Sequence, residues 1–431
     1  MQTIDAQSGT ELLRHRLFLT FVALLPLHTV FVRAWVAWKP WLVLLILLVG
    51  IQAFEGIRDR TWPWHRRASI GLAVFLGCLA ASWPGTNMGR FAALWLAAGV
   101  GGAVMLVTHR ELTSRPGMVD RALRVVFWSA AAMGISAFVV SLAAIGTFGS
   151  GAIDAIESFP GVATVAKEAY LADGFVALTN WHTDPGYAAA WMNLWAVLAF
   201  VAWSRGLGTK RSWIDGAVVG SLVVAVFMTL SRTGTLGLIV GMALASWFAR
   251  REGKAWRTLG LFVASVLVSA AALLSILWIA DVPGEGGDLP ASFSFRFTQG
   301  VTLGPGFTGD EGTDGLPGDH RSIVWPIYID YFNDDPLRGA GLGHGWASGV
   351  QEPHNLVLQL LGETGLVGLL GFIVLGAAIV WGGVSPLGII VLGTTLSASM
   401  TQTVIFEATW WFAAALVLAE RHGATTKPDI S

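Results

Sequence analysis

The stretch LVLLILLVGI, residues 42–51, contains no charged side chain. Residues 261–279 and 387–400 with their flanks are likewise almost free of charge over a length that can cross a bilayer. About 20 apolar residues cover the hydrocarbon core as a helix, and lipid allows only helices or closed barrels to satisfy the backbone. Barrel strands would alternate over short segments, and these runs do not. The sequence therefore predicts an all-α polytopic membrane protein.

The composition agrees with this fold class. Hydrophobic residues make up 54% of the chain and charged residues 13%, against roughly 25% charged in soluble domains. The mean hydropathy is +0.62. A net charge of −1 gives no indication of a nucleic-acid partner, and the single cysteine, Cys78, excludes an internal disulfide and a cysteine-based metal site.

The apolar runs predict about twelve transmembrane helices. They are expected at 17–32, 34–54, 68–83, 90–108, 122–147, 185–203, 213–230, 233–249, 257–280, 355–381, 386–403 and 404–420. Most lysines and arginines then fall on one side, which the positive-inside rule assigns to the cytoplasm together with both termini. The bases left on the outer side are Arg33, Lys39, Arg90, Lys167, Arg232, Arg296, Arg321 and Arg338.

Two outer loops are long. We divide the chain into residues 1–280 with the first nine spans, 281–354 as a large outer loop, and 355–431 with the last three spans and a tail. The 281–354 loop is rich in acids, and we expect a helix around 320–333. Its residues Trp325, Ile327, Tyr328 and Tyr331 suit an amphipathic helix lying on the bilayer surface. In the 148–184 loop we expect a short amphipathic helix. Loops of such length are usually functional.

The first candidate site segment is Ser231-Arg232-Thr233-Gly234, at the outer turn between two spans. A guanidinium held at this depth suits phosphate oxygens, to which it can bind bidentately. The alternative is an interfacial arginine that only reaches toward lipid headgroups. Gly234 and Gly237 would let a substrate or a neighbouring helix approach closely.

The second segment begins at Arg321 and continues through Trp325 to the glycine-rich run that starts at Asp335 and ends at Gly343. Arg321 either binds an anion or pairs with one of the many nearby acids. The glycine run is either a flexible turn or a backbone cradle.

The third segment runs from Pro353 and His354 through Asn355 to Glu363. Proline before a long apolar pattern marks a helix start, which places His354 at a helix N-terminus on the outer membrane boundary. The partial positive charge there favours a neutral imidazole, the form that a general base requires at pH 7. The alternative is a helix cap. Glu363, deeper in the span, needs a partner and is either functional or part of a structural network.

The order of these segments resembles that of the O-antigen ligase and Wzy-type polysaccharide polymerase superfamily, most specifically over residues 354–368. One departure exists: where relatives often carry Asn-Pro-Asn before a mid-chain span, this chain has His182-Thr183-Asp184-Pro185-Gly186-Tyr187. The departure leaves a supporting role for Asp184 or His182 in question.

The resemblance implies a bacterial inner-membrane enzyme that transfers a glycan from undecaprenyl diphosphate at the periplasmic face. The implied reaction is inverting and needs no metal or other cofactor. Arg232 and Arg321 would bind the donor diphosphate, His354 would be the catalytic base, and Ser231, Asn355, Glu363 and Asp184 would support them. The implied partners are the lipid-linked oligosaccharide, an acceptor glycan, membrane lipids and a chain-length regulator.

The acceptor separates two readings of this resemblance. A ligase uses lipid A–core, which is anionic, whereas the acidic outer loop favours a less charged acceptor such as a second lipid-linked repeat unit. We therefore expect a polymerase, with O-antigen ligase as the alternative. A lipid-linked oligosaccharide transporter is a more distant alternative, because it would need ionisable groups near the bilayer midplane and repeat symmetry.

Overall fold

The structure is a computed structural model of the 431-residue chain. It describes residues 9–27, 32–33, 37–83, 88–144, 166–167, 177–178, 185–209, 211–229, 231–251, 321–350, 352–400 and 404–425, with isolated positions between 260 and 271. All statements below concern these residues.

The described chain is helical apart from two short hairpins, in agreement with the predicted all-α class. The helices are α1 (Gly9–Leu24), α2 (Pro40–Arg58), α3 (Arg66–Ala81), α4 (Met88–Thr113), α5 (Met118–Ala144), α7 (Pro185–Ser204), α8 (Ser212–Met228), α9 (Arg232–Arg251), α12 (Arg321–Asp334), α13 (His344–Ala347), α14 (Leu356–Val380), α15 (Pro386–Ser399), the 3₁₀ turn η1 (Val404–Phe406) and α16 (Ala408–Thr425). The hairpins pair β1 (Val32–Arg33) with β2 (Ala37–Trp38) and β3 (Ala166–Lys167) with β4 (Ala177–Leu178).

Every predicted span except 257–280 overlaps one of these helices, although the first, 17–32, shares only residues 17–24 with α1. Four helices are long and apolar enough to cross a membrane: Pro40–Arg58, Met88–Thr113, Gly186–Ser204 and Leu356–Val380. Three shorter apolar helices, Trp213–Phe227, Pro386–Ser399 and Ala408–Glu420, accompany them. The total of twelve and the three-part division of the chain therefore stay predictions. Span 257–280 lies largely outside the described residues, as do residues 281–320 of the long loop.

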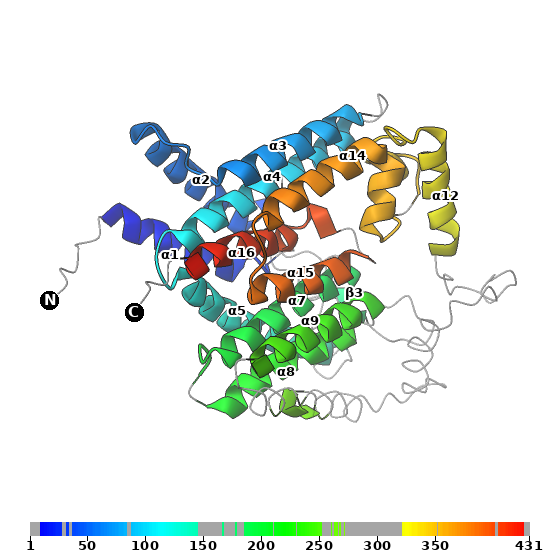
Figure 1. Ribbon diagram of the computed structural model, residues 1–431. Helices are drawn as coiled ribbons and strands as arrows, with labels where there is room; N and C mark the ends of the chain where they lie inside the picture. Colours follow the sequence, from blue (N-terminus) through cyan, green and yellow to red (C-terminus); the bar gives the residue numbers. More distant parts are fainter. Residues whose placement is uncertain are drawn as a thin grey trace, which may run out of the picture.

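The helices form two groups with α16 between them (Figure 1). In the first group, α3 packs along α4 and α14; in the second, α7 packs against α8 and α9, and α9 against α15. Helix α16 contacts both α4 and α15. Helix α12 lies beside one end of α14.

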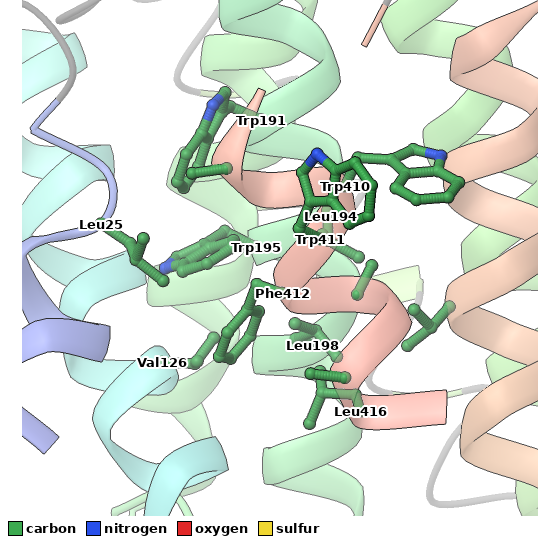
Figure 2. Close-up of a cluster of buried hydrophobic side chains, with 14 of the residues drawn as sticks. Leu25, Val126, Trp191, Leu194, Trp195, Leu198, Trp410, Trp411, Phe412 and Leu416 are labelled. Carbon is green, nitrogen blue, oxygen red and sulfur yellow. The ribbon is translucent and has the colours of Figure 1, made fainter. Parts of the chain in front are cut away.

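Large aromatic rings fill the space between α7 and α16 (Figure 2). The ring centroids of Trp195 and Phe412 are 5.4 Å apart, and those of Trp191 and Trp195 are 4.8 Å apart. Trp411 packs so closely on α4 that a Cβ at Gly101 would lie 2.2 Å from its Cδ1. Such rings bury a large apolar area between α7 and α16.

Ion pairs gather both ends of the described chain at one end of the bundle. Arg205, just after α7, lies 3.1 Å from Glu420 near the end of α16 and 3.4 Å from Asp120 at the start of α5. In the neighbouring α4–α5 turn, Arg115 lies 2.9 Å from Glu11 of α1. The opposite end of the bundle carries the start of α14 and is called the site end below.

Candidate functional site

The start of α14 is fixed by Asn355, which is its N-cap. The Asn355 Oδ1 accepts a hydrogen bond of 3.0 Å from the Leu358 backbone N–H, and its Nδ2 donates one of 3.0 Å to the Met400 carbonyl at the end of α15. A capping side chain of this kind satisfies an otherwise unpaired N–H of the first turn. Asn355 therefore takes the capping role that was the alternative for His354, and that alternative is wrong.

His354 directly precedes this cap and has a left-handed backbone, with φ of 48°. Histidine is one of the few non-glycine residues that adopt this region with some frequency, and it does so at a cost. The residue before it is also fixed, because the Trp325 Nε1 donates a hydrogen bond of 2.8 Å to the Pro353 carbonyl. His354 is thus held between two anchors, one from α12 and one from α15, with its side chain partly exposed.

Glu352, two residues before His354, joins three further elements at the same place. Its Oε2 accepts a hydrogen bond of 2.5 Å from the Tyr187 hydroxyl of α7, and its Oε1 accepts one of 3.2 Å from the Trp346 Nε1 of α13. The Arg90 guanidinium of α4 lies 3.9 Å from the same Oε1 and 4.4 Å from the centroid of the Trp346 ring. These contacts bring α4, α7 and α13 to the segment that carries His354.

The glycine-rich run fits into a break in α14. Gly365 has φ of 61° and ψ of −161°, outside the helical region, so the helix is interrupted there. The run supplies the missing hydrogen bonds, which is the behaviour of a backbone cradle rather than of a flexible turn. These bonds run from Ala340 N to Gly362 O (2.9 Å), Gly341 N to Glu363 O (2.8 Å), Leu366 N to Pro336 O (2.9 Å) and Val367 N to Leu337 O (3.1 Å).

Glu363 completes this arrangement from within α14. Its two carboxylate oxygens accept hydrogen bonds from the backbone N–H groups of Gly343 (3.0 Å) and Gly345 (3.2 Å), and from the Gln359 side chain (3.2 Å). Its exposed fraction is 1%. Of the two roles left open by the sequence, the structure favours the structural network: Glu363 holds the start of α13 onto α14.

Helix α12 packs on α14 through side chains that the sequence had placed on the bilayer surface. Tyr328 is completely buried, and its ring meets Gly362, where an added Cβ would lie 2.8 Å from Tyr328 Cδ1. Burial, followed by the charge of Glu363, raises the pKa of the Tyr328 hydroxyl. The expectation that Tyr328 faces lipid is therefore wrong, because α14 covers that face of α12.

The backbone of Arg232 lies at the site end. Ser231 caps α9 by accepting a hydrogen bond of 3.2 Å from the Gly234 N–H. Helix α9 runs parallel to α7, because Gly234, Gly237 and Gly241 meet Ala189, Asn193 and Val197 in turn. The start of α9 therefore lies beside the start of α7, whose Tyr187 contacts Glu352. Gly234 and Gly237 serve helix contact here, since an added Cβ would lie 2.3 Å from Ala189 Cβ or 2.4 Å from Asn193 Nδ2 of α7.

Arg321 is the first residue of α12, one helical turn before Trp325. The side-chain contacts of Arg232 and Arg321 lie outside the described part of the structure, as do Asp184 and His182. The structure therefore brings His354, Asn355 and the backbones of Ser231, Arg232 and Arg321 to one end of the bundle, with Glu363 beneath them.

The O-antigen ligase family model matches residues 217–373, about a third of the chain. The matched segment runs from α8 through α9, α12 and α13 into α14, and it contains Arg232, Arg321 and His354. The match supports the resemblance of this segment to the O-antigen ligase and Wzy-type superfamily. Together with the apolar helices, it indicates a membrane glycosyltransferase. No curated protein matches the chain.

Sequence reasoning missed three polar residues of this glycosyltransferase. Tyr187 and Arg90 lie outside the matched segment, and Glu352 lies inside it. Tyr187 ends the departing segment 182–187, Arg90 is one of the outer bases, and Glu352 adjoins Pro353, so each had a weak signal. Their convergence depends on long-range contacts, such as that between Tyr187 and Glu352, 165 positions apart, and no local pattern reveals such contacts.

Proposed function

We propose that the chain transfers a glycan from undecaprenyl diphosphate to a sugar hydroxyl at the periplasmic face, with inversion and without a metal. His354 removes the proton of the acceptor hydroxyl while that oxygen bonds to the anomeric carbon. The bond from the anomeric carbon to phosphate oxygen breaks, and undecaprenyl diphosphate leaves with the electron pair. General-base catalysis of this kind contributes about 10²–10⁴ in rate.

The left-handed backbone of His354, held between Trp325 and Asn355, carries this proposal. Backbone strain that the surrounding structure maintains is characteristic of functional sites, where it fixes a side chain in one orientation. A capping residue needs no such conformation, and Asn355 already caps the helix. A base must meet the hydroxyl within hydrogen-bond distance, so a fixed backbone contributes directly to the rate.

Arg232 and Arg321 are proposed to bind the two phosphates of the donor. Both residues begin helices at the site end, where N-terminal N–H groups and guanidinium groups favour anions. Negative charge grows on the diphosphate as the glycosidic bond breaks, and fixed positive groups stabilise it. The diphosphate then leaves without needing a general acid.

The acceptor separates two candidate activities. The acids of the 281–354 loop favour an acceptor of low charge, a second lipid-linked repeat unit, and hence polymerisation, with a chain-length regulator as a partner. The description of the matching family as O-antigen ligase favours transfer to lipid A–core instead. We propose polymerisation and keep ligation as the second candidate.

The enzyme is proposed to lie in the bacterial inner membrane with both termini in the cytoplasm. This orientation is supported by the ion pairs that gather Glu11 and Glu420 at the end opposite His354. Buried charges also lie toward that end: Arg14 contacts Glu55 (2.7 Å) and Glu111 (2.9 Å).

Purified protein with lipid-linked oligosaccharide tests the proposal. Product ladders without lipid A indicate a polymerase, and a single transfer to lipid A–core indicates a ligase. Flipping of intact donor by an otherwise inert protein would support the transporter. His354→Ala should abolish transfer to either acceptor, whereas His65→Asn, which keeps a capping side chain at the start of α3, should not. Equal products from wild type and His354→Ala would remove His354 from the mechanism.

A further inference from the structure

Trp346 presents an exposed aromatic ring that contacts Glu352, two residues before His354. Trp346 belongs to the four-residue helix α13, and its exposed fraction is 55%. The ring is held on one side by the Arg90 guanidinium, 4.4 Å from its centroid, and at its edge by the hydrogen bond from Nε1 to Glu352. An exposed indole with fixed position and orientation is a stacking platform, because its π-face carries partial negative charge.

The backbone beneath Trp346 is fixed as well. Gly343 begins α13 with φ of 82°, and an added Cβ there would lie 2.9 Å from the Arg90 side chain. The Glu363 carboxylate of α14 accepts hydrogen bonds from the N–H groups of Gly343 and Gly345. The position of the ring is therefore set by α4 and α14, the two helices on which α13 rests.

Glu352 retains capacity for hydrogen bonds to a ligand. An ionised carboxylate offers about four lone-pair sites, and the Tyr187 hydroxyl and the Trp346 Nε1 use one each. Its side chain is 18% exposed, and that of Arg90 is 33% exposed. An aromatic face bordered by a carboxylate and a guanidinium matches a pyranose, which has an apolar C–H face and a rim of hydroxyl groups.

The location of Trp346, Arg90 and Glu352 indicates whether they would bind the donor sugar or the acceptor sugar. Arg232 begins α9, and Arg90 lies near the start of α4; in Figure 1 these helices lie in opposite groups, with α15 and α16 between them. In an inverting transfer the attacking hydroxyl approaches from the side opposite the leaving phosphate, and the base lies next to that hydroxyl. Relative to the phosphate bound at Arg232, the glycan that carries the hydroxyl therefore lies across His354, on the α4 side.

We propose that Trp346, Arg90 and Glu352 form the subsite that binds the acceptor sugar. The C–H face of the pyranose stacks on Trp346, and its hydroxyls donate to Glu352 and accept from Arg90. Tyr187 positions Glu352 from α7. This inference rests on the proposed transfer reaction and adds the residues that recognise the acceptor.

The test uses full-length protein and two probes. If the protein is a ligase, the probe is lipid A–core, and its KM is measured at saturating donor. If the protein is a polymerase, the probe is the lipid-free glycan that mild acid releases from the donor. This glycan lacks the diphosphate, so its Ki as an inhibitor reports binding at the acceptor subsite. Trp346→Ala should raise this KM or Ki about ten-fold and change kcat less than about three-fold, because stacking binds ground state and transition state alike.

Trp83→Ala is the matched control. Trp83 is 54% exposed at the same end of the bundle and stacks on Phe91, but no contact joins it to Glu352 among the described residues. It should leave acceptor affinity unchanged, and Trp346→Phe should retain most of it. Equal losses from Trp83→Ala and Trp346→Ala would overturn the subsite, since both rings would then act as membrane-interface anchors.

Two further variants keep the inference testable if Trp346→Ala does not fold. Glu352→Gln keeps an oxygen acceptor for the Trp346 Nε1, and Arg90→Lys keeps a cation for the ring, while they remove a charge and the planar guanidinium respectively. Each should raise the acceptor KM or Ki at least about three-fold. Unchanged acceptor affinity in these variants and in every folded Trp346 variant overturns the inference. An inactive wild-type protein with both acceptors would instead contradict the proposed function itself.

Discussion

The Trp325 indole of α12 donates its hydrogen bond to the Pro353 carbonyl, one residue before His354, over 2.8 Å. This contact links the helix that begins with Arg321 to the residue proposed as the base. It joins α12 to the start of α14, so residues 321–350 adjoin the proposed active site.

Trp325→Phe tests this link. The variant keeps the ring but removes the N–H donor, so the peptide between Pro353 and His354 can rotate and the left-handed backbone of His354 can relax. We expect kcat to fall about ten-fold with a small change in thermal midpoint, since one hydrogen bond contributes about 0.5–1.5 kcal/mol to stability. Trp83→Phe is the control. An unchanged kcat for Trp325→Phe would show that the bond does not position His354.

Gly365→Ala tests the break in α14. Its φ of 61° with ψ of −161° is a conformation essentially limited to glycine, and a Cβ would lie 2.4 Å from the Leu337 carbonyl carbon. We expect a loss of more than about 3 kcal/mol of stability, seen as a lower thermal midpoint in detergent. Gly376→Ala in the same helix meets no atom within 4 Å and should be neutral or slightly stabilising. Equal midpoints for both variants would contradict the break.

Glu363→Ala tests the carboxylate that holds α13. The N–H groups of Gly343 and Gly345 would lose their acceptors. Each buried N–H group left without an acceptor lowers the free energy of unfolding by about 1–3 kcal/mol. Hydrogen exchange should accelerate over residues 339–347 while α15 and α16 stay protected, and transfer activity should fall with it. If exchange in this segment were unchanged, Glu363 would have a role other than that of a structural anchor.

Glu55→Gln tests the buried ion pairs at the opposite end. Glu55 binds Arg14 at 2.7 Å and Arg110 at 2.7 Å, and removing one partner of a buried pair costs about 3–5 kcal/mol. The thermal midpoint should fall, whereas kcat of the folded protein should stay the same because the site is at the other end. Asp59→Asn, in the exposed pair with Arg58, should change neither quantity. A changed kcat without a changed midpoint would assign this cluster to function.

Much of this architecture follows from the sequence, because apolar runs, proline at helix starts and turn residues act locally. The helix over 320–333 is confirmed as α12, and the helix start after Pro353 is confirmed as α14. The break at Gly365 was not predictable, because only the carbonyl and N–H groups of a distant segment make it stable. The same holds for Glu363, whose partners are backbone groups some 20 residues earlier in the chain.

Some residues of the candidate site can be recognised from neighbouring residues in the sequence, whereas others depend on contacts with distant parts of the chain. His354 and Asn355 follow from one helix start, although the sequence could not say which of them caps it. Glu352 has a role only because Tyr187 and Arg90 reach it from α7 and α4, and long-range contacts of this kind leave no spacing pattern. Tyr328 was misplaced because an amphipathic pattern does not distinguish a lipid surface from a neighbouring helix.

Single-turnover transfer by His354→Asn tests the central claim most directly. Asparagine tolerates the left-handed backbone, so the fold of the site is kept while the base is removed. With donor bound and acceptor in excess, we predict that the rate of glycan transfer falls by about 10²–10⁴ while donor affinity stays within about three-fold of wild type. A transfer rate close to that of wild type in this variant would contradict the account, because His354 would not be the base.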